Sequence, residues 1–307
     1  LYSLSTELET MILYYNTTLF EENGWELPDT IDDLMALSEE IAAAGYIPFS
    51  HGNAEWRPAN EWFVSALLNS VAGPDNVYSA LTGNLEWTDE SFGTAISTLD
   101  TMQQNGWFSG GLDVYYTITF DEFLAAFGNG EAAMNMEGSW RMSGLSNYFG
   151  EAGGNDNDWD WIPVPSTTGE DIFSLGTGST YSINSWSENP DSAAEFLTYF
   201  FSPETQASIT VNCGIAPAPV RISADMLDGV DPRQARLFEA IGQASDAGNY
   251  GYLTWTFWPP RSDVYIYEEI ELLWDGQITV EDYLVGLNEV FAEELESGDI
   301  PPIPLRQ

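Results

Sequence analysis

The chain has 307 residues, 44% of them hydrophobic, which is enough for a sizeable core and for more than one lobe. It carries 49 acidic residues against 7 basic ones, and the formal net charge of −42 makes nucleic acid and anionic membrane surfaces poor partners. All seven basic residues are arginines, so chemistry that needs a lysine is excluded, while one cysteine (Cys213) and one histidine (His51) exclude an intrachain disulfide and a histidine metal cluster.

The first half of the chain is expected to form helices and one buried strand. Residues 30–45 have the pattern of an amphipathic helix, in which Thr30 and Asp33 form a capping box and Gly45 ends the helix. Further helices are expected over 58–71, over 88–106 with Thr88 as the cap, and over 119–130, and a short buried strand over 131–137.

The second half begins with a loop over 153–161 and continues with both strands and helices. Strands are expected over 160–165 and 173–184, two helices broken at Pro203 over 189–212, an extended connector over 216–220, and a helix over 279–298 capped by Thr279 and stopped by Gly298. Strands separated by helices indicate an α/β fold.

Several phrases in a fixed order resemble one family. They are Tyr15-Asn16 followed by an acidic stretch, Pro28 and a Thr-capped helix, then "FGNGEAAMNMEGSW", "NPDSAAEFLTYFFSPETQ", "CGIAPAPV" and "LWDGQITVEDYLVGL". In this order the chain resembles the extracellular solute-binding proteins of ABC importers, in the carbohydrate-binding group that includes maltose-binding protein. The resemblance implies a two-lobe periplasmic-binding-protein-like fold with hinge crossings and covers almost the whole chain.

The resemblance also implies how the lobes are divided. Residues 1–178 would form the first part of the second lobe, residues 179–218 a hinge crossing with helices returning to the first lobe, and residues 219–307 the remainder of the second lobe. Members of the family carry about a hundred residues before the point that matches Leu1. The first lobe is therefore expected to be incomplete in this chain, and a preceding segment or a further chain is expected to complete it.

Trp140 is the leading candidate for a ligand contact. The C–H face of a pyranose lies flat against an aromatic ring, and its hydroxyls need charged or amide partners at the ring edge. Trp140 follows Gly138-Ser139 at the expected end of a strand and precedes Arg141, and it matches the stacking tryptophan of the family. The alternative is that Trp140 belongs to the core.

The resemblance supplies the other candidates for the ligand site. In "HGNAEWRPANEW", Trp56 would stack and Arg57 or Glu55 would hold hydroxyls, while Glu61 and Trp62 are expected to be helix residues. Each candidate also has a structural alternative, as a hinge acid, a surface ring or a core ring. The remaining candidates are Glu9 near the first crossing, Tyr181 in the second, and Trp255, Trp258 and Arg261 in "YLTWTFWPPRSDVY".

Metal binding and catalysis find little support. Asp156, Asp158 and Asp160 have the alternate spacing of a calcium loop, but Trp161 replaces the glycine and Thr167 the glutamate, so they are weak candidates. No cofactor is expected, and the sequence has no nucleophile elbow, phosphate loop or dinucleotide fingerprint. We therefore expect that the protein is not an enzyme. The alternative, a glycan-cleaving enzyme, would need two carboxylates about 5 to 10 Å apart in the cleft.

Carbohydrate binding for transport is the function that the resemblance implies. A neutral mono- or oligosaccharide would bind between the lobes, close them, and pass to an ABC permease, with the protein extracellular, tethered to the cell surface or periplasmic. The alternative is a surface structural or adhesive protein built on the same scaffold.

Overall fold

Helices and strands alternate along the chain in the structure, a computed structural model that describes residues 3–218 and 220–306. Pro219, in the connector expected over 216–220, lies outside the described residues. Up to the end of the fourth strand the elements are β1 (Leu4–Ser5), β2 (Leu8–Asn16), α1 (Thr17–Asn23), α2 (Ile31–Ala43), β3 (Ile47–Phe49), the 3-10 turn η1 (Arg57–Ala59), α3 (Asn60–Leu67), the π-helical turn η2 (Leu68–Ala72), α4 (Pro74–Leu81), α5 (Glu90–Gln104), α6 (Leu112–Tyr115), α7 (Phe120–Gly128) and β4 (Ala132–Gly138).

The second half contributes four further strands and most of the long helices. They are η3 (Ser139–Arg141), α8 (Met142–Leu145), α9 (Gly150–Gly153), β5 (Trp159–Pro163), β6 (Phe173–Thr177), β7 (Thr180–Tyr181), α10 (Pro190–Phe200), α11 (Pro203–Cys213), η4 (Ala224–Leu227), α12 (Pro232–Ala247), β8 (Tyr250–Tyr252), α13 (Thr254–Phe257), α14 (Pro260–Trp274) and α15 (Val280–Ser297).

Side-chain caps set where several helices begin. The capping box expected at Thr30 and the cap expected at Thr279 are present, and Thr279 and Thr119 each form a capping box as well. The cap expected at Thr88 is wrong, because the Asp89 carboxylate accepts a 3.0 Å hydrogen bond from the backbone N–H of Ser91, so that α5 begins one residue later. A carboxylate at a helix N-terminus is favoured by the helix dipole as well as by the hydrogen bond.

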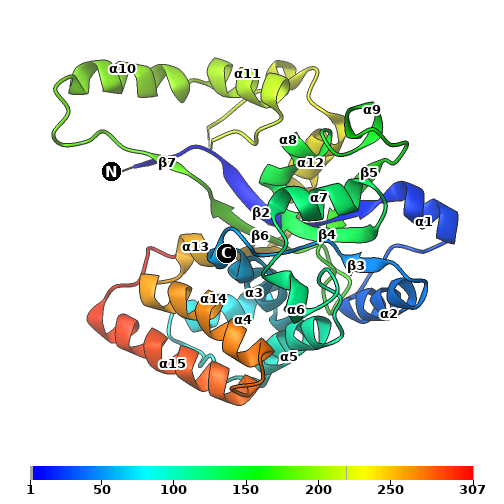
Figure 1. Cartoon of the computed structure of the whole chain (residues 1–307). Helices are drawn as coiled ribbons and strands as arrows, with labels where there is room; N and C mark the ends of the chain where they lie inside the picture. Colours follow the sequence, from blue (N-terminus) through cyan, green and yellow to red (C-terminus); the bar gives the residue numbers. More distant parts are fainter. Residues whose placement is uncertain (1–2, 219, 307) are drawn as a thin grey trace.

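The central strand of the sheet is β2. It pairs antiparallel with β4 along one edge, and on its other edge with β6 at residues 8–10 and with β5 at residues 12–16. Parallel pairs β3–β4 and β6–β8 extend the sheet on the two sides. The mixed sheet with helices on both faces agrees with the α/β fold expected from the sequence (Figure 1).

The side chains of β2 alternate between two cores. Met11 and Leu13 belong to the larger core beneath α3, α5, α14 and α15, whereas Ile12 and Tyr14 belong to the smaller core beneath α7, α8 and α12. This alternation follows from the two-residue period of a strand. It fixes the register of β2, because a slip by one residue would exchange the two sets.

A pair of helices lies apart from the sheet. The strand expected over 173–184 is interrupted: β6 ends at Thr177, and β7 pairs instead with β1 in a separate two-stranded ribbon. This ribbon leads to α10, which Figure 1 shows away from the body, and then to α11, whose C-terminal end lies beside α8 and α12. None of the residues of α10 is buried. The break between α10 and α11 lies at Pro203, as expected from the sequence.

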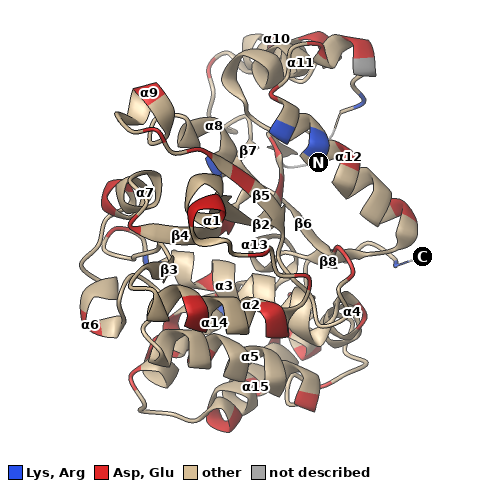
Figure 2. Cartoon of the chain, turned by 90° about the vertical axis from the view of Figure 1, so that its right-hand side faces the viewer, with Lys and Arg blue, Asp and Glu red and all other residues tan. Residues whose placement is uncertain are grey.

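Acidic side chains are spread over the surface. Figure 2 shows them on helices of both layers, with few basic positions among them. Among the described residues, no helix combines the length and apolar character that a membrane crossing requires.

Replacing Thr279, the cap of the last helix, tests whether side-chain caps stabilise the fold. Thr279→Ala removes the hydroxyl that accepts from the backbone N–H of Asp282, and we expect the free energy of unfolding in urea to fall by about 1 kcal/mol. Thr94→Ala, on the exposed face of α5, is the matched control because its hydroxyl bonds only the Glu90 carbonyl of its own helix. An equal loss in both variants would contradict the capping role.

Candidate functional site

Gly138 makes room for the ring of Trp140. A Cβ atom at Gly138 would lie 2.0 Å from the Trp140 ring, because the chain turns at the end of β4 and folds the indole back over the strand. A glycine next to a binding residue can let a ligand approach the backbone closely. In the structure it is the neighbouring tryptophan that approaches, so a larger residue at 138 would displace the ring.

Four tryptophan rings form a continuous row beside this turn. Trp140 meets Trp62 and Trp255 edge to face, with ring centroids 5.3 and 5.7 Å apart. Trp56 leans on the other side of Trp62 at 5.6 Å and is 46% exposed. This packing fixes the rings against one another, and Trp56 is the ring of the row that is most exposed for stacking, whereas Trp62 is buried and stacked on Phe120.

A buried carboxylate lies at the end of this row. Glu9, near the start of β2, is 9% exposed, and its Oε2 accepts a 3.0 Å hydrogen bond from Trp255 Nε1. Burial, followed by the charge of Glu7, raises the pKa of Glu9 to about 7, although the bond from Trp255 opposes the rise. Glu9 can therefore change charge near neutral pH.

Glu61 of α3 is a second buried acid beside the rings. Its Oε2 accepts a 3.0 Å hydrogen bond from Thr254 Oγ1, and its side chain lies close to Asp263 of α14. Burial and the neighbouring Asp263 raise the pKa of Glu61 well above its ordinary value. The two carboxyl groups are best described as a pair that holds a proton.

These residues surround an open hollow of about 510 Å³, which we call the tryptophan hollow. A volume in this range suits a ligand of one or two sugar rings. Its walls are four tryptophans, three glutamates and a short backbone segment after β6: Trp56, Trp62, Trp140, Trp255, Glu7, Glu9, Glu61, Thr177, Gly178 and Ser179.

Arg141 turns away from the hollow and binds the strand beneath it. Its Nε and Nη2 donate to Glu137 Oε1 at 2.8 and 2.5 Å, and Glu137 is fully buried in β4. Trp140 Nε1 donates to the same oxygen at 3.3 Å. The charge of Arg141 is thus compensated, and the ion pair anchors the turn that carries Trp140.

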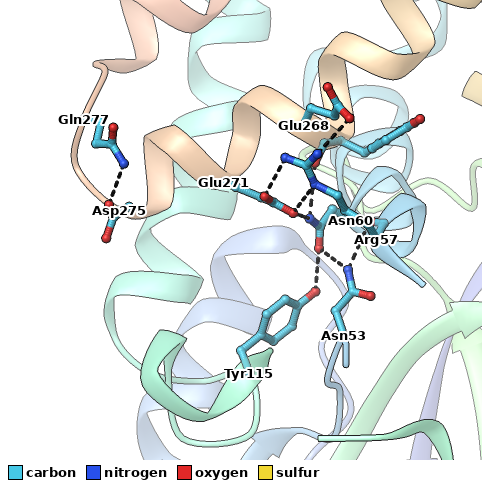
Figure 3. Close-up of polar contacts among 9 residues, drawn as sticks. Asn53, Arg57, Asn60, Tyr115, Glu268, Glu271, Asp275 and Gln277 are labelled. Atoms are coloured by element: carbon cyan, nitrogen blue, oxygen red, sulfur yellow. Dashed lines mark hydrogen bonds and ion pairs between the residues drawn. The ribbon is translucent and has the colours of Figure 1, made fainter. Parts of the chain in front are cut away.

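Arg57 fastens η1 to α14. It donates to both oxygens of Glu271, at 2.9 and 2.7 Å, and to Glu268 at 2.7 Å, and Figure 3 shows this fork beside Asn60. Asn60 extends the network to Tyr115, whose hydroxyl donates to it at 2.9 Å. Arg57 therefore holds the segment that presents Trp56 and does not line the hollow.

Three other candidates also lie outside the hollow. Trp258 is buried against Trp87, with ring centroids 4.3 Å apart, and the Arg261 side chain pairs with Glu293 on the surface. Tyr181 lies in β7 with its ring against Phe200 of α10. Of the nine candidates, the structure brings Glu9, Trp56, Trp140 and Trp255 together around one space.

Two of the three calcium candidates are bound to arginines of α12. Asp158 pairs with Arg233 at 2.6 Å, and Asp160 pairs with Arg236. Each guanidinium also covers a tryptophan of the adjacent strand. Within residues 3–218 and 220–306, no group of three or more histidine, cysteine or acidic side chains, Asp156 included, is arranged to hold a metal ion.

His51 is enclosed by aromatic rings. Its ring lies 4.6 Å from Phe63 and 4.8 Å from Phe123, and burial lowers its pKa to about 3. A fully buried, neutral imidazole cannot serve as the base of a hydrolytic triad at the surface.

Sequence reasoning missed Glu7, Glu61 and Trp62 as parts of the hollow. Glu61 and Trp62 were correctly expected to belong to a helix. They lie in the first turn of α3, where their side chains line the hollow. The spacing of Trp56 and Trp62 was a signal in the sequence. The two residues flank a 3-10 turn, which brings their rings into contact.

The sequence matches the model of one protein family, described as bacterial extracellular solute-binding protein, over residues 2–207. An ABC transporter extracellular-binding protein of Pyrococcus horikoshii is 26% identical over 222 residues, which are 71% of this chain and 47% of the relative. The diacetylchitobiose binding protein of Streptomyces coelicolor is 26% identical over 75% of this chain and 49% of the relative. The chain thus spans about half the length of these curated relatives.

A solved structure shows the same fold. The chitin oligosaccharide binding protein superimposes with a TM-score of 0.82 at 23% identity, covering 97% of this chain and 72% of the other. At this identity the likeness concerns the fold, which is that of a two-lobe binding protein, and all three of these similar proteins are named as binding proteins.

The raised pKa of Glu9 makes a specific contribution to stability. Since folded Glu9 keeps its proton up to about pH 7 and the unfolded chain releases it near 4.5, its contribution is present below pH 4.5 and is lost as pH rises to 7. Relative to Glu9→Gln, the unfolding free energy of the unmodified protein should fall across this window, by at most about 1.4 kcal/mol per pH unit.

Urea denaturation at several pH values measures this difference. Glu26→Gln, at an exposed position, is the matched control for removing one acid. A constant difference between the unmodified protein and Glu9→Gln from pH 4.5 to 7 would contradict the shift.

Proposed function

The chain belongs to the family of bacterial extracellular solute-binding proteins, and from this premise we propose that its tryptophan hollow binds a carbohydrate for uptake by an ABC permease. The row of Trp56, Trp62, Trp140 and Trp255 around an open space is the observation that carries the proposal. Sugar rings stack on such indoles through their C–H faces, and this contact tolerates different linkages.

The acids of the hollow supply the polar half of sugar recognition. A carboxylate accepts hydrogen bonds from two neighbouring hydroxyls, and Glu9 is held in place by Trp255. Glu7 and Glu61 offer further acceptors at the same wall. Acidic sugars are disfavoured, because the three glutamates and the net charge repel them.

Names of relatives support this ligand class. The matched proteins include a diacetylchitobiose binding protein, a multiple sugar-binding protein of Streptococcus mutans and a xylose/arabinose-binding protein of Haloferax volcanii. We therefore assign the ligand to the carbohydrates without naming one sugar.

Closure between lobes is the mechanism we propose. Residues 1–178 and 219–307 would form one lobe, and residues 179–218 would leave it toward the other. The separation of α10 from the sheet-bearing body supports this division, as does the β1–β7 ribbon next to the hollow. A ligand that contacts both lobes only when they are closed shifts the population toward the closed form.

Delivery to a permease follows from the same proposal. The closed form would present both lobes to membrane subunits, with the protein outside the cell or in the periplasm, free or tethered. The relative from Pyrococcus horikoshii is named as an ABC transporter extracellular-binding protein, which supports this partner.

Removing the central ring tests the site. We expect Trp140→Ala to weaken binding of a responsive sugar by about 30-fold or more, since a central stacking ring contributes about 2 kcal/mol or more. Intrinsic tryptophan fluorescence against a panel of neutral oligosaccharides identifies the ligand, and isothermal titration calorimetry measures both affinities.

Trp186→Ala is the matched control. Trp186 is 90% exposed, lies outside the hollow and precedes α10, so its loss should leave the affinity unchanged. Equal affinities of Trp140→Ala and the unmodified protein would place the ligand elsewhere.

A further inference from the structure

We propose that the tryptophan hollow selects sugars that carry a protonated amine over their neutral counterparts. This inference rests on the proposed carbohydrate function and specifies its ligand class. It departs from the neutral sugar expected from the sequence, because the charges that matter are those lining the hollow.

The hollow contains acidic groups without a compensating cation. Three of its lining residues are glutamates and none is basic. The two arginines adjacent to lining tryptophans are both engaged elsewhere, Arg57 with Glu268 and Glu271 and Arg141 with Glu137. A bound ammonium group would therefore meet carboxylates with no fixed positive charge at the same wall.

One carboxylate oxygen is left available. Glu9 is nine-tenths buried and lines the hollow, and its Oε2 is occupied by Trp255. No described residue donates a hydrogen bond to its Oε1. That oxygen lies against Gly178, where an added Cβ would come within 2.1 Å of it, so a larger residue at 178 would displace the carboxyl group.

The rings add a second attraction for a cation. Trp140 stands edge to face between Trp62 and Trp255, so that indole faces of different orientation border the same space. A cation over an indole face is attracted by the ring quadrupole, and aromatic enclosures with nearby acids recognise ammonium groups in this way. A neutral hydroxyl gains much less from either contact.

The protonation of the acids is consistent with a cationic ligand. Burial and Glu7 raise the pKa of Glu9 to about 7, and burial with Asp263 raises that of Glu61. In both cases burial and a neighbouring acid disfavour the charged form. An ammonium group in contact with either carboxyl would favour its charged form.

Three β-1,4-linked disaccharides that differ in one group per ring test the proposal. They are the glucosamine dimer, with free amines, N,N′-diacetylchitobiose and cellobiose, and calorimetry at pH 6.5 in low salt gives their affinities. We expect the glucosamine dimer to bind at least about tenfold more tightly than either neutral sugar. This preference should shrink as salt is raised to 0.5 M, because salt screens the attraction.

Charge-removing variants identify the residues responsible. Glu9→Gln keeps an acceptor for Trp255 Nε1 and should reduce the preference for the amine by about tenfold, because the amine loses more affinity than cellobiose does. Glu7→Gln, less buried than Glu9, gives a second variant if the first does not fold, as judged by circular dichroism. Glu26→Gln removes an acid from an exposed position outside the hollow and should preserve the preference.

The outcomes separate this inference from the proposed function. Binding of a neutral sugar with equal or weaker binding of the amine overturns the amine preference and leaves the carbohydrate site intact. A preference that survives in both Glu9→Gln and Glu7→Gln overturns the role of these acids. Failure of all three disaccharides and of the wider neutral panel overturns both proposals.

Discussion

The structure depends on the hydrogen bonding of one strand. Along its nine residues β2 pairs with β4 on one edge and with β6 and then β5 on the other, so segments from residue 8 to residue 177 are joined through it. Its alternating side chains enter two separate cores, Met11 and Leu13 on one face and Ile12 and Tyr14 on the other. Loss of this register would separate the two layers of helices.

The candidate site is built where these pairings end. Glu9 occupies the β2 segment that pairs with β6, Trp140 follows the end of β4, and Gly178 follows the end of β6. The helical layer then supplies Trp62 from α3 and Trp255 from α13. Residues far apart in the sequence meet because the strands that precede or follow them are neighbours in one sheet, a common origin of binding sites in α/β folds.

Much of this arrangement could be predicted from the sequence. Expected caps and hydrophobic periodicity located the helices at Thr30 and Thr279, and the resemblance to a binding-protein family indicated Glu9, Trp140 and Trp255, which lie around the hollow. The helix predictions succeed where local chemistry decides the outcome, and the ligand roles of these three residues stay predictions. The cap of α5 shows the limit of such predictions. Thr88 was expected and Asp89 is found, because two adjacent residues compete for the same backbone donors.

Other features depend on tertiary neighbours that no local pattern contains. Arg57 and Arg141 were expected to hold hydroxyls, but each has a carboxylate partner. Arg141 pairs with buried Glu137 on the preceding strand, and Arg57 binds Glu271 in bidentate fashion across 214 residues. Trp258 was expected in the site and is instead enclosed between α15 and the loop that carries Trp87. The choice among twelve tryptophans was settled by packing rather than by composition.

A crystal structure of the protein with a bound oligosaccharide tests the central claim most directly, that the tryptophan hollow is the ligand site. The account expects a sugar ring stacked on Trp140, with Glu9 or Glu61 within hydrogen-bonding distance of its polar groups. A sugar bound elsewhere, with the hollow occupied only by solvent, would contradict it.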